Sequence, residues 1–109
     1  DYAYISVEKK QDGLYVSQTL CQDADKGSAE RDTAGVKLSA NTFWLRVKVE
    51  ENAVCSFSYS TDGKTFAPVG QQFKARQGRW IGAKVGIFAL GKGPVSERGY
   101  ADYDWFRIE

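Results

Sequence analysis

The feature that most constrains this chain is a period-two alternation of apolar and polar residues, interrupted by turn signals at intervals of roughly ten residues. Helical periodicity is scarce. Short alternating segments bounded by Gly, Asp and Asn are typical of sandwiches, in which each strand buries one face. The pattern therefore predicts an all-β, antiparallel β-sandwich.

Seven segments read as strands, and the connections between them read as turns or loops. The predicted strands cover residues 2–9, 14–22, 35–38, 42–50, 53–60, 80–90 and 100–108. The stretches 23–33 and 91–99 are rich in Gly and charge, as surface loops at the ends of a sandwich are. No repeat or Pro-rich linker divides the chain, so we expect one module over residues 1–109.

Two local patterns suggest how side chains are directed. In segment 42–50 the apolar positions are expected to face the core and the alternate positions the solvent; the first set is Phe43, Leu45, Val47 and Val49, and the second is Trp44, Arg46, Lys48 and Glu50. Further on, Asp62-Gly63 predicts a tight hairpin with positive φ, in which Ser60 bonds the turn backbone and Phe66 folds back.

Charge and hydropathy narrow the range of partners. The chain has 15 Lys and Arg against 14 Asp and Glu, scattered without a basic stripe, so a nucleic-acid partner is not expected. No apolar run approaches the roughly 20 residues that span a bilayer, and no signal peptide is recognisable, so no membrane partner is expected either. The compartment does not follow from the sequence; a secreted or periplasmic location is favoured over a cytoplasmic one.

The absence of histidine removes Ser-His-Asp and Cys-His catalysis and most zinc sites. Cys21 and Cys55 lie in apolar, strand-like runs, where a small buried side chain is the first interpretation and a disulfide the second. A metal or redox role is the third. The sequence alone does not decide between them.

Carboxylates are the remaining catalytic or metal-binding groups. Asp102 and Asp104 are predicted on one strand face about 7 Å apart, a spacing that suits glycoside hydrolysis, although solvated or structural carboxylates are the simpler interpretation. Asp23 and Asp25 alternate like ligands of a calcium loop but lack its third acid. We therefore predict no catalytic residue and no required cofactor, with calcium at Asp23, Asp25 or Asp104 as a weak alternative.

Exposed aromatic side chains could bind sugars, because Trp and Tyr rings stack on pyranose faces. The tryptophans are Trp44, Trp80 and Trp105. A core position is the first interpretation for Trp105, whereas Trp44 and Trp80 are as consistent with an exposed ring. Trp80 follows Gly78-Arg79 at a junction between loop and strand.

Three stretches together resemble the C-terminal β-sandwich of family 43 glycoside hydrolases, the β-xylosidase and α-L-arabinofuranosidase group. They are CSFSYSTDGKTF (55–66), GRWIGAKVGIFA (78–89) and GYADYDWFR (99–107). The resemblance implies a concanavalin A-like jelly roll and an accessory, noncatalytic role beside a separate propeller that carries the catalytic carboxylates. The family module is nearer twice this length, so we expect this chain to correspond to its second half.

The resemblance also assigns a residue. In such enzymes an aromatic side chain before the Gly-Ala of the penultimate strand reaches the propeller's pocket, and Trp80, before Ile81-Gly82-Ala83, matches that position. The expected partners are thus the catalytic propeller and an oligo- or polysaccharide.

Alternative functions remain open on the sequence. One is an autonomous carbohydrate-binding module that grips xylan-type glycans with Trp44, Arg46 and Lys84. A small glycosidase that uses Asp102 and Asp104 is another, and a purely structural or oligomerising sandwich is the last.

Overall fold

The strands of this chain form two antiparallel sheets in a computed structural model that describes residues 1–76, 85–90 and 102–108. The elements are β1 (Tyr2–Lys10), β2 (Gly13–Cys21), a short 3-10 helix (Ala24–Lys26), β3 (Arg31–Leu38), β4 (Trp44–Val49), β5 (Val54–Ser60), β6 (Ala67–Pro68) and β7 (Phe73–Lys74). The predicted all-β class and antiparallel pairing are confirmed. Nowhere in these described ranges is there a helix long and apolar enough to cross a membrane.

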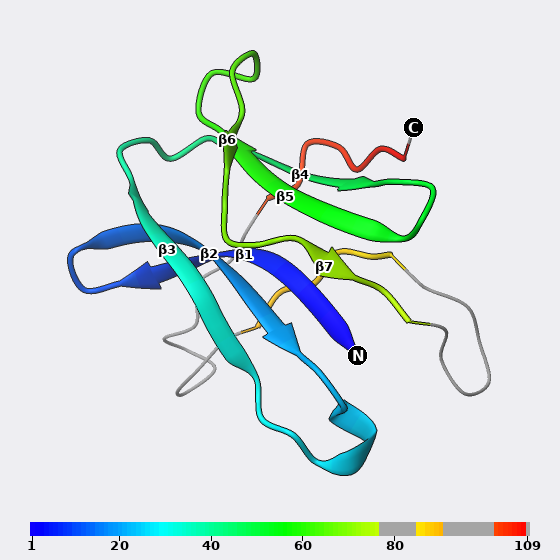
Figure 1. Cartoon of the computed structure of the whole chain (residues 1–109). Coiled ribbons are helices and arrows are strands. Elements are labelled where there is room, and N and C mark those ends of the chain that lie inside the picture. The colour runs from blue at the N-terminus through cyan, green and yellow to red at the C-terminus, as the bar shows by residue number, and fades with distance from the viewer. Residues whose placement is uncertain (77–84, 91–101, 109) are drawn as a thin grey trace.

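The two sheets lie on top of each other, as Figure 1 shows. The first sheet has the order β1-β2-β3, and the second has the order β4-β5-β6, with β7 also paired to β5. Strands that are neighbours in the first sheet are also consecutive in the chain. Gln11 and Asp12 form the short turn between β1 and β2. The result is a sandwich of two meanders.

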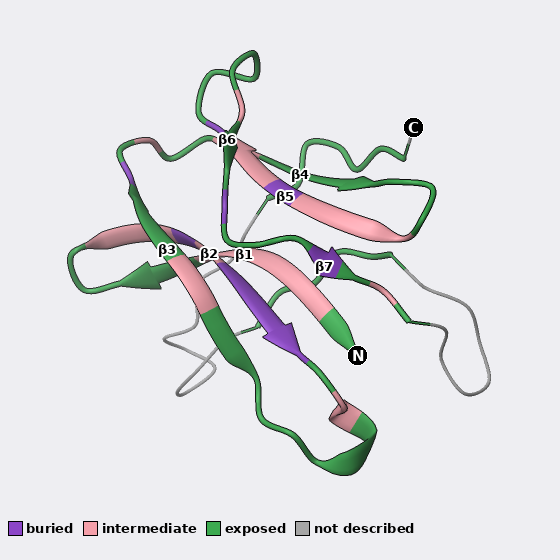
Figure 2. Cartoon of the chain, in the orientation of Figure 1, coloured by how far each residue is buried: buried purple, intermediate pink, exposed green. Residues whose placement is uncertain are grey.

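Alternation in the sequence decides which face of each strand meets the other sheet. Ile5 and Val7 of β1 and Val16, Gln18 and Leu20 of β2 point into the core, whereas the alternate residues, such as Ser6 and Ser17, point outward. Two clusters form that core, one around Val16, Leu38 and Val69 and the other around Leu20, Phe57 and Phe73. Buried segments of β2, β5 and β7 are visible in Figure 2. Both clusters draw on both sheets, so neither sheet has a complete core alone.

A polar side chain joins the two sheets inside this core. Gln18 of β2 is fully buried; its Nε2 donates to the carbonyl of Gln71 at 2.6 Å, and its Oε1 accepts from the Gln71 N–H at 2.8 Å. Thr33 also donates to that oxygen. Because every polar atom of Gln18 is paired, its burial does not leave an unmet hydrogen bond.

The first three predicted strands and the two of the β4–β5 hairpin are present, but some boundaries and the burial of β4 differ. β3 begins at Arg31, four residues before the predicted start at residue 35. The sequence did not indicate these first residues because their polar character is typical of a loop. Leu45, Val47 and Val49 lie on the predicted face, opposite Tyr59, Phe57 and Cys55, but they are less buried than a core position implies, at 38%, 42% and 55% exposed. β4 is an edge strand, and exposure rises along it toward the β4–β5 turn.

The prediction of strands at 80–90 and 100–108 is not met in the parts that the structure describes. Residues 85–90 and 102–108 have no ladder partners there and expose apolar side chains, among them Val85, Leu90, Trp105 and Ile108. Without a neighbouring strand to satisfy its N–H and C=O groups, an alternating segment does not form a strand. The other residues of both segments lie outside the described ranges.

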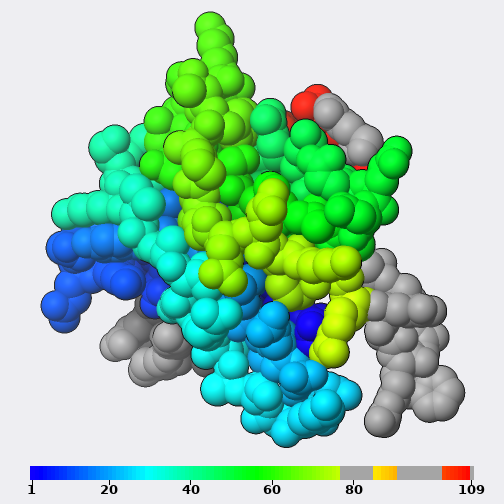
Figure 3. Space-filling model, in the orientation of Figure 1, coloured from blue at the N-terminus to red at the C-terminus, as the bar shows by residue number. Residues whose placement is uncertain are grey.

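The Asp62-Gly63 turn is present in a longer form than predicted. The connection from β5 to β6 runs from residue 61 to 66 and projects from the second sheet, as Figure 3 shows in light green. Gly63 has φ of 76°, whereas Asp62 is not among the positive-φ residues of the described ranges. The predicted role of Ser60 is confirmed, because its Oγ accepts from the N–H groups of Asp62 and Gly63.

Candidate functional site

The predicted sugar-contacting residues divide between described and undescribed parts of the chain. Trp44 and Arg46 lie two residues apart on β4 and therefore share the outer face of the second sheet. Trp80 and Lys84 lie outside the described residues. The structure thus brings Trp44 and Arg46 together.

Both of these side chains pack against the turn at 61–66. A Cβ placed on Gly63 would lie 2.9 Å from Cζ2 of Trp44, so the indole lies directly beneath the turn and is half-buried. The guanidinium carbon of Arg46 lies 3.6 Å from the centroid of the Phe66 ring, a cation–π contact. The predicted fold-back of Phe66 therefore ends on Arg46, and part of the Trp44 ring is covered by the turn.

The turn itself is held by a dense set of hydrogen bonds. Asp62 Oδ1 accepts from the N–H groups of Thr65 at 2.9 Å and Lys64 at 2.8 Å, and from the Ser60 hydroxyl at 2.8 Å. These bonds favour the carboxylate form and lower the pKa of Asp62 to about 2. Asp62 is thus a structural carboxylate that fixes the loop covering Trp44.

The weak calcium candidates do not come together. Asp23 accepts a 2.8 Å hydrogen bond from Arg76, which also binds Asp1, and Arg76 is the main reason that the pKa of Asp23 is lowered. Asp25 is exposed on the 3-10 helix, and Asp104 is exposed in segment 102–108. No group of three or more potential metal ligands occurs among residues 1–76, 85–90 and 102–108.

The other carboxylate and thiol candidates resemble surface or structural groups. Asp102 and Asp104 are exposed and do not lie on a strand, so the premise that placed them on one strand face was wrong. Both cysteines are free thiols: Cys21 is buried and donates to the carbonyl of Ser28 at 3.3 Å, and Cys55 is half-buried beside the second core cluster.

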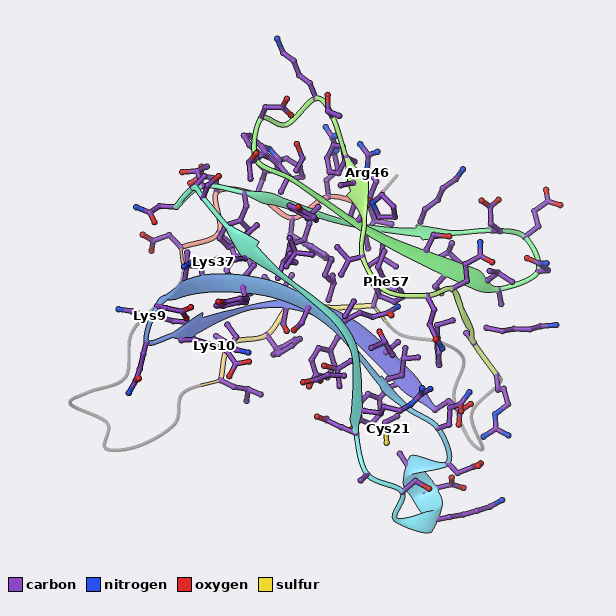
Figure 4. The ribbon with its side chains drawn as sticks, turned by 60° about the vertical axis from the view of Figure 1, so that its left-hand side comes forward. Lys9, Lys10, Cys21, Lys37, Arg46 and Phe57 are labelled. Atoms are coloured by element: carbon purple, nitrogen blue, oxygen red, sulfur yellow. The ribbon has the colours of Figure 1, made fainter. Side chains whose placement is uncertain are left out.

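A hollow that we did not predict lies on the outward face of the first sheet. It has a volume of about 340 Å³, and we call it the outer hollow; its lining includes Glu8, Lys10, Tyr15, Ser17, Asp32 and Gly35. Figure 4 shows Lys10 and Lys37 at the hairpin end of this sheet, with Cys21 at its opposite end and Arg46 on the other sheet. The alternation in β1 and β2 could have identified the lining residues of these two strands, because they are the outward-facing positions. The lining residues of β3 could not have been identified in this way, because they depend on the strand register.

Side chains around the outer hollow are fixed by one another. The Tyr15 hydroxyl donates to Asp12 at 2.7 Å, which raises the pKa of Tyr15 and lowers that of Asp12. Lys10 Nζ lies 4.8 Å from the centroid of the Tyr15 ring. Thr19 donates to Asp32 Oδ1 at 2.6 Å.

A second group of tyrosines closes the other end of this face. The hydroxyls of Tyr2 and Tyr4 donate to the two carboxylate oxygens of Glu30, at 2.6 and 2.9 Å. The hydrogen bond to Glu30 is the main reason that the pKa of Tyr2 is raised, whereas for Tyr4 it is burial. The edge of Phe88 packs against Tyr4 with ring centroids 5.1 Å apart. These contacts attach segment 85–90 and the β2–β3 connection to β1.

Comparison with known proteins supplies the context for this geometry. Residues 1–109 match the model of the beta-xylosidase C-terminal concanavalin A-like domain. A beta-xylosidase of Formosa agariphila is 32% identical over 77 residues, which are 71% of this chain and 12% of that protein. The matched part of the chain therefore covers about an eighth of the length of that relative. No solved structure matches the chain.

Proposed function

Because this chain belongs to the family of beta-xylosidase C-terminal concanavalin A-like domains, we propose that it is the noncatalytic accessory sandwich of a glycoside hydrolase. In this proposal it packs on the catalytic domain of the same enzyme and helps to shape a xyloside or arabinoside pocket. The observation that carries it is the family match over residues 1–109.

Exposed apolar side chains support a packing role. Segments 85–90 and 102–108 expose Val85, Leu90, Trp105 and Ile108, and exposed apolar surface in a small domain commonly marks an interface. The second sheet adds Val47 and Val49 at its edge. A catalytic domain seated on these residues would remove them from water, at roughly 25 cal/mol for each Å² of apolar area.

Trp80 is the residue through which the sandwich would reach the pocket. Its place before Ile81-Gly82-Ala83 matches the aromatic position of similar enzymes, where Phe is common. An aromatic wall orients a sugar by stacking and excludes water, so its loss affects catalysis even though it carries no proton.

The test uses the full-length polypeptide that carries this chain. We expect Trp80→Ala to lower kcat/KM for an aryl xyloside by roughly tenfold, which is about 1.4 kcal/mol of transition-state stabilisation. Trp80→Phe should retain most of the activity, because the ring is preserved. Kinetics of Trp80→Ala equal to those of the unmodified enzyme, at equal thermal stability, would contradict the proposed role of Trp80.

A second candidate function is favoured by the cluster of Trp44, Arg46 and Phe66 on the second sheet, which presents aromatic and cationic groups on one face. In that case the chain is a carbohydrate-binding module for xylan-type glycans. Arg46→Ala would then weaken retention on insoluble xylan and leave aryl-xyloside kinetics unchanged, whereas the accessory proposal predicts no change in retention.

A further inference from the structure

We propose that the outer hollow of the first sheet is a binding site for a neutral oligosaccharide, laid across the strands β1, β2 and β3. It lies on the opposite side of the sandwich from the Trp44 and Arg46 face, because the two sheets meet through their inner faces. The inference stands on this geometry and does not depend on the proposed role of Trp80.

The strand register makes a slot of the hollow. Three small residues lie side by side across the sheet, and bulkier residues flank them in the neighbouring rows. The middle row is Ser6, Ser17 and Gly35; the row on one side is Glu8, Tyr15 and Lys37, and the row on the other is Tyr4, Thr19 and Asp32. Of these residues, Ser17 and Gly35 line the floor of the hollow, Glu8 and Tyr15 line one wall, and Asp32 lines the other. With strands about 4.8 Å apart, the middle row runs roughly 10 Å across the sheet, and each neighbouring row stands about 7 Å from it along the strands.

The end of this slot at β3 is open space. A Cβ placed on Gly35 would meet no atom within 4 Å, so no other side chain fills the space above this glycine. A volume of about 340 Å³ is within the range of small-ligand sites. A larger side chain at Gly35 would therefore occupy the space that a ligand would take.

The lining chemistry suits a hydroxylated, uncharged ligand. Hydroxyls of Ser6 and Ser17 face each other at a long 3.5 Å, the carboxylate of Asp32 lines the hollow, and the Tyr15 ring supplies an apolar wall. Sugars need both donors and acceptors at their hydroxyls and a flat surface for their C–H face. The lining carries charges of both signs, Glu8 and Asp32 against Lys10, and the neighbouring Lys37 is paired with Asp12 at 3.7 Å, so no concentration of one sign favours a strongly charged ligand.

The walls are also organised before any ligand arrives. Tyr15 is held by Asp12 and Lys10, and Asp32 is held by Thr19. Side chains already fixed by such bonds lose little rotamer entropy on binding. This lower entropic cost favours the binding of a sugar, whose affinity is usually weak.

The experiment fills the slot from its floor. Gly35→Val places a β-branched side chain in the open space without disturbing a contact, and valine favours strands, so the variant should fold. We expect xylo-oligosaccharides to bind the chain with a dissociation constant on the order of millimolar, measured by calorimetry and by amide shifts at Ser17 and Gly35. Gly35→Val should weaken that binding at least tenfold, about 1.4 kcal/mol.

Two further substitutions separate the faces and the roles. Ser58→Val makes the matching change on the outer face of the second sheet, between Arg46 and Pro68, and should leave binding unchanged. Tyr15→Ala should weaken binding more than Tyr15→Phe, because Tyr15→Phe keeps the ring that forms the wall and loses only the hydrogen bond to Asp12. The proposal is overturned by absence of binding at millimolar ligand, by equal binding of Gly35→Val, or by loss of binding in Ser58→Val alone.

Discussion

At the scale of single residues, Gly70 and Gln18 depend on each other. Gly70 has φ of 71°, and a Cβ placed on it would lie 1.9 Å from Gln18 Oε1. The left-handed conformation costs an L-residue about 1–2 kcal/mol, and displacement of Gln18 would break its buried hydrogen bonds, at about 1–3 kcal/mol more. We therefore expect Gly70→Ala to reduce the free energy of unfolding by about 3 kcal/mol, measured by urea titration.

Gly27 provides the matched control for this substitution. It has φ of 82°, yet a Cβ there would meet nothing within 4 Å. Gly27→Ala should thus cost only about 1–2 kcal/mol, the price of the backbone conformation alone. Equal losses in the two variants would show that the Gln18 contact contributes nothing to stability.

Asp62 makes the turn at 61–66 sensitive to acid. Its pKa is about 2 in the folded chain against 3.8 ordinarily, so the carboxylate form is bound more tightly by the fold. A lowered pKa contributes stability at all pH values above about 4, and that contribution is lost as the pH falls from about 4 to about 2. Asp62→Asn should therefore be less stable than the native chain at neutral pH and converge with it near pH 2.

Urea midpoints measured across this pH range test the prediction. Asp25→Asn, at an exposed position outside the turn, serves as the control for loss of one negative charge. A gap between the native chain and Asp62→Asn that stays constant from neutral pH to pH 2 would disprove the role of ionisation.

At the scale of elements, the two strands of the β4–β5 hairpin contribute unequally to the core. Val47 and Phe57 face each other in the ladder, but Phe57 is 5% exposed and Val47 is 42% exposed. Figure 4 shows Phe57 between the sheets. We expect Phe57→Ala to cost about 3–5 kcal/mol and Val47→Ala less than about 1 kcal/mol, measured by thermal or urea unfolding.

The same comparison reports on the partner of β4. If the full-length polypeptide buries the apolar edge of the second sheet, Val47→Ala should cost more there than in the chain alone. A Val47→Ala loss as large as that of Phe57→Ala in the chain alone would mean that β4 is already covered.

At the scale of the whole molecule, the sequence predicted the strands that have clear alternation and clear turns. The segments at β1, β2 and β5 were predicted within about two residues, because each carries core residues at alternate positions and is bounded by polar turns. β6 and β7 are two-residue pairings, too short to show a period. Resemblance to known enzymes, and not periodicity, supplied the family.

The site was less predictable because it depends on register. The β-bulge between Gln18 and Thr19 shifts β3 along β2 and decides that Gly35 lies beside Ser17. In the same way, the contact of Trp44 with Gly63 arises from two segments that meet only in the folded turn. Local patterns carry no information about either arrangement.

The bond between Asp1 and Arg76 has a consequence for how the sandwich is tethered. Arg76 Nε donates to Asp1 at 2.7 Å across 75 positions of sequence, and the Asp1 side chain is only 5% exposed. A polypeptide joined to Asp1 would therefore leave the molecule beside Arg76, close after the end of β7. A domain at the end of such a polypeptide would be held at high effective concentration near that part of the second sheet, so its docking there would need little intrinsic affinity.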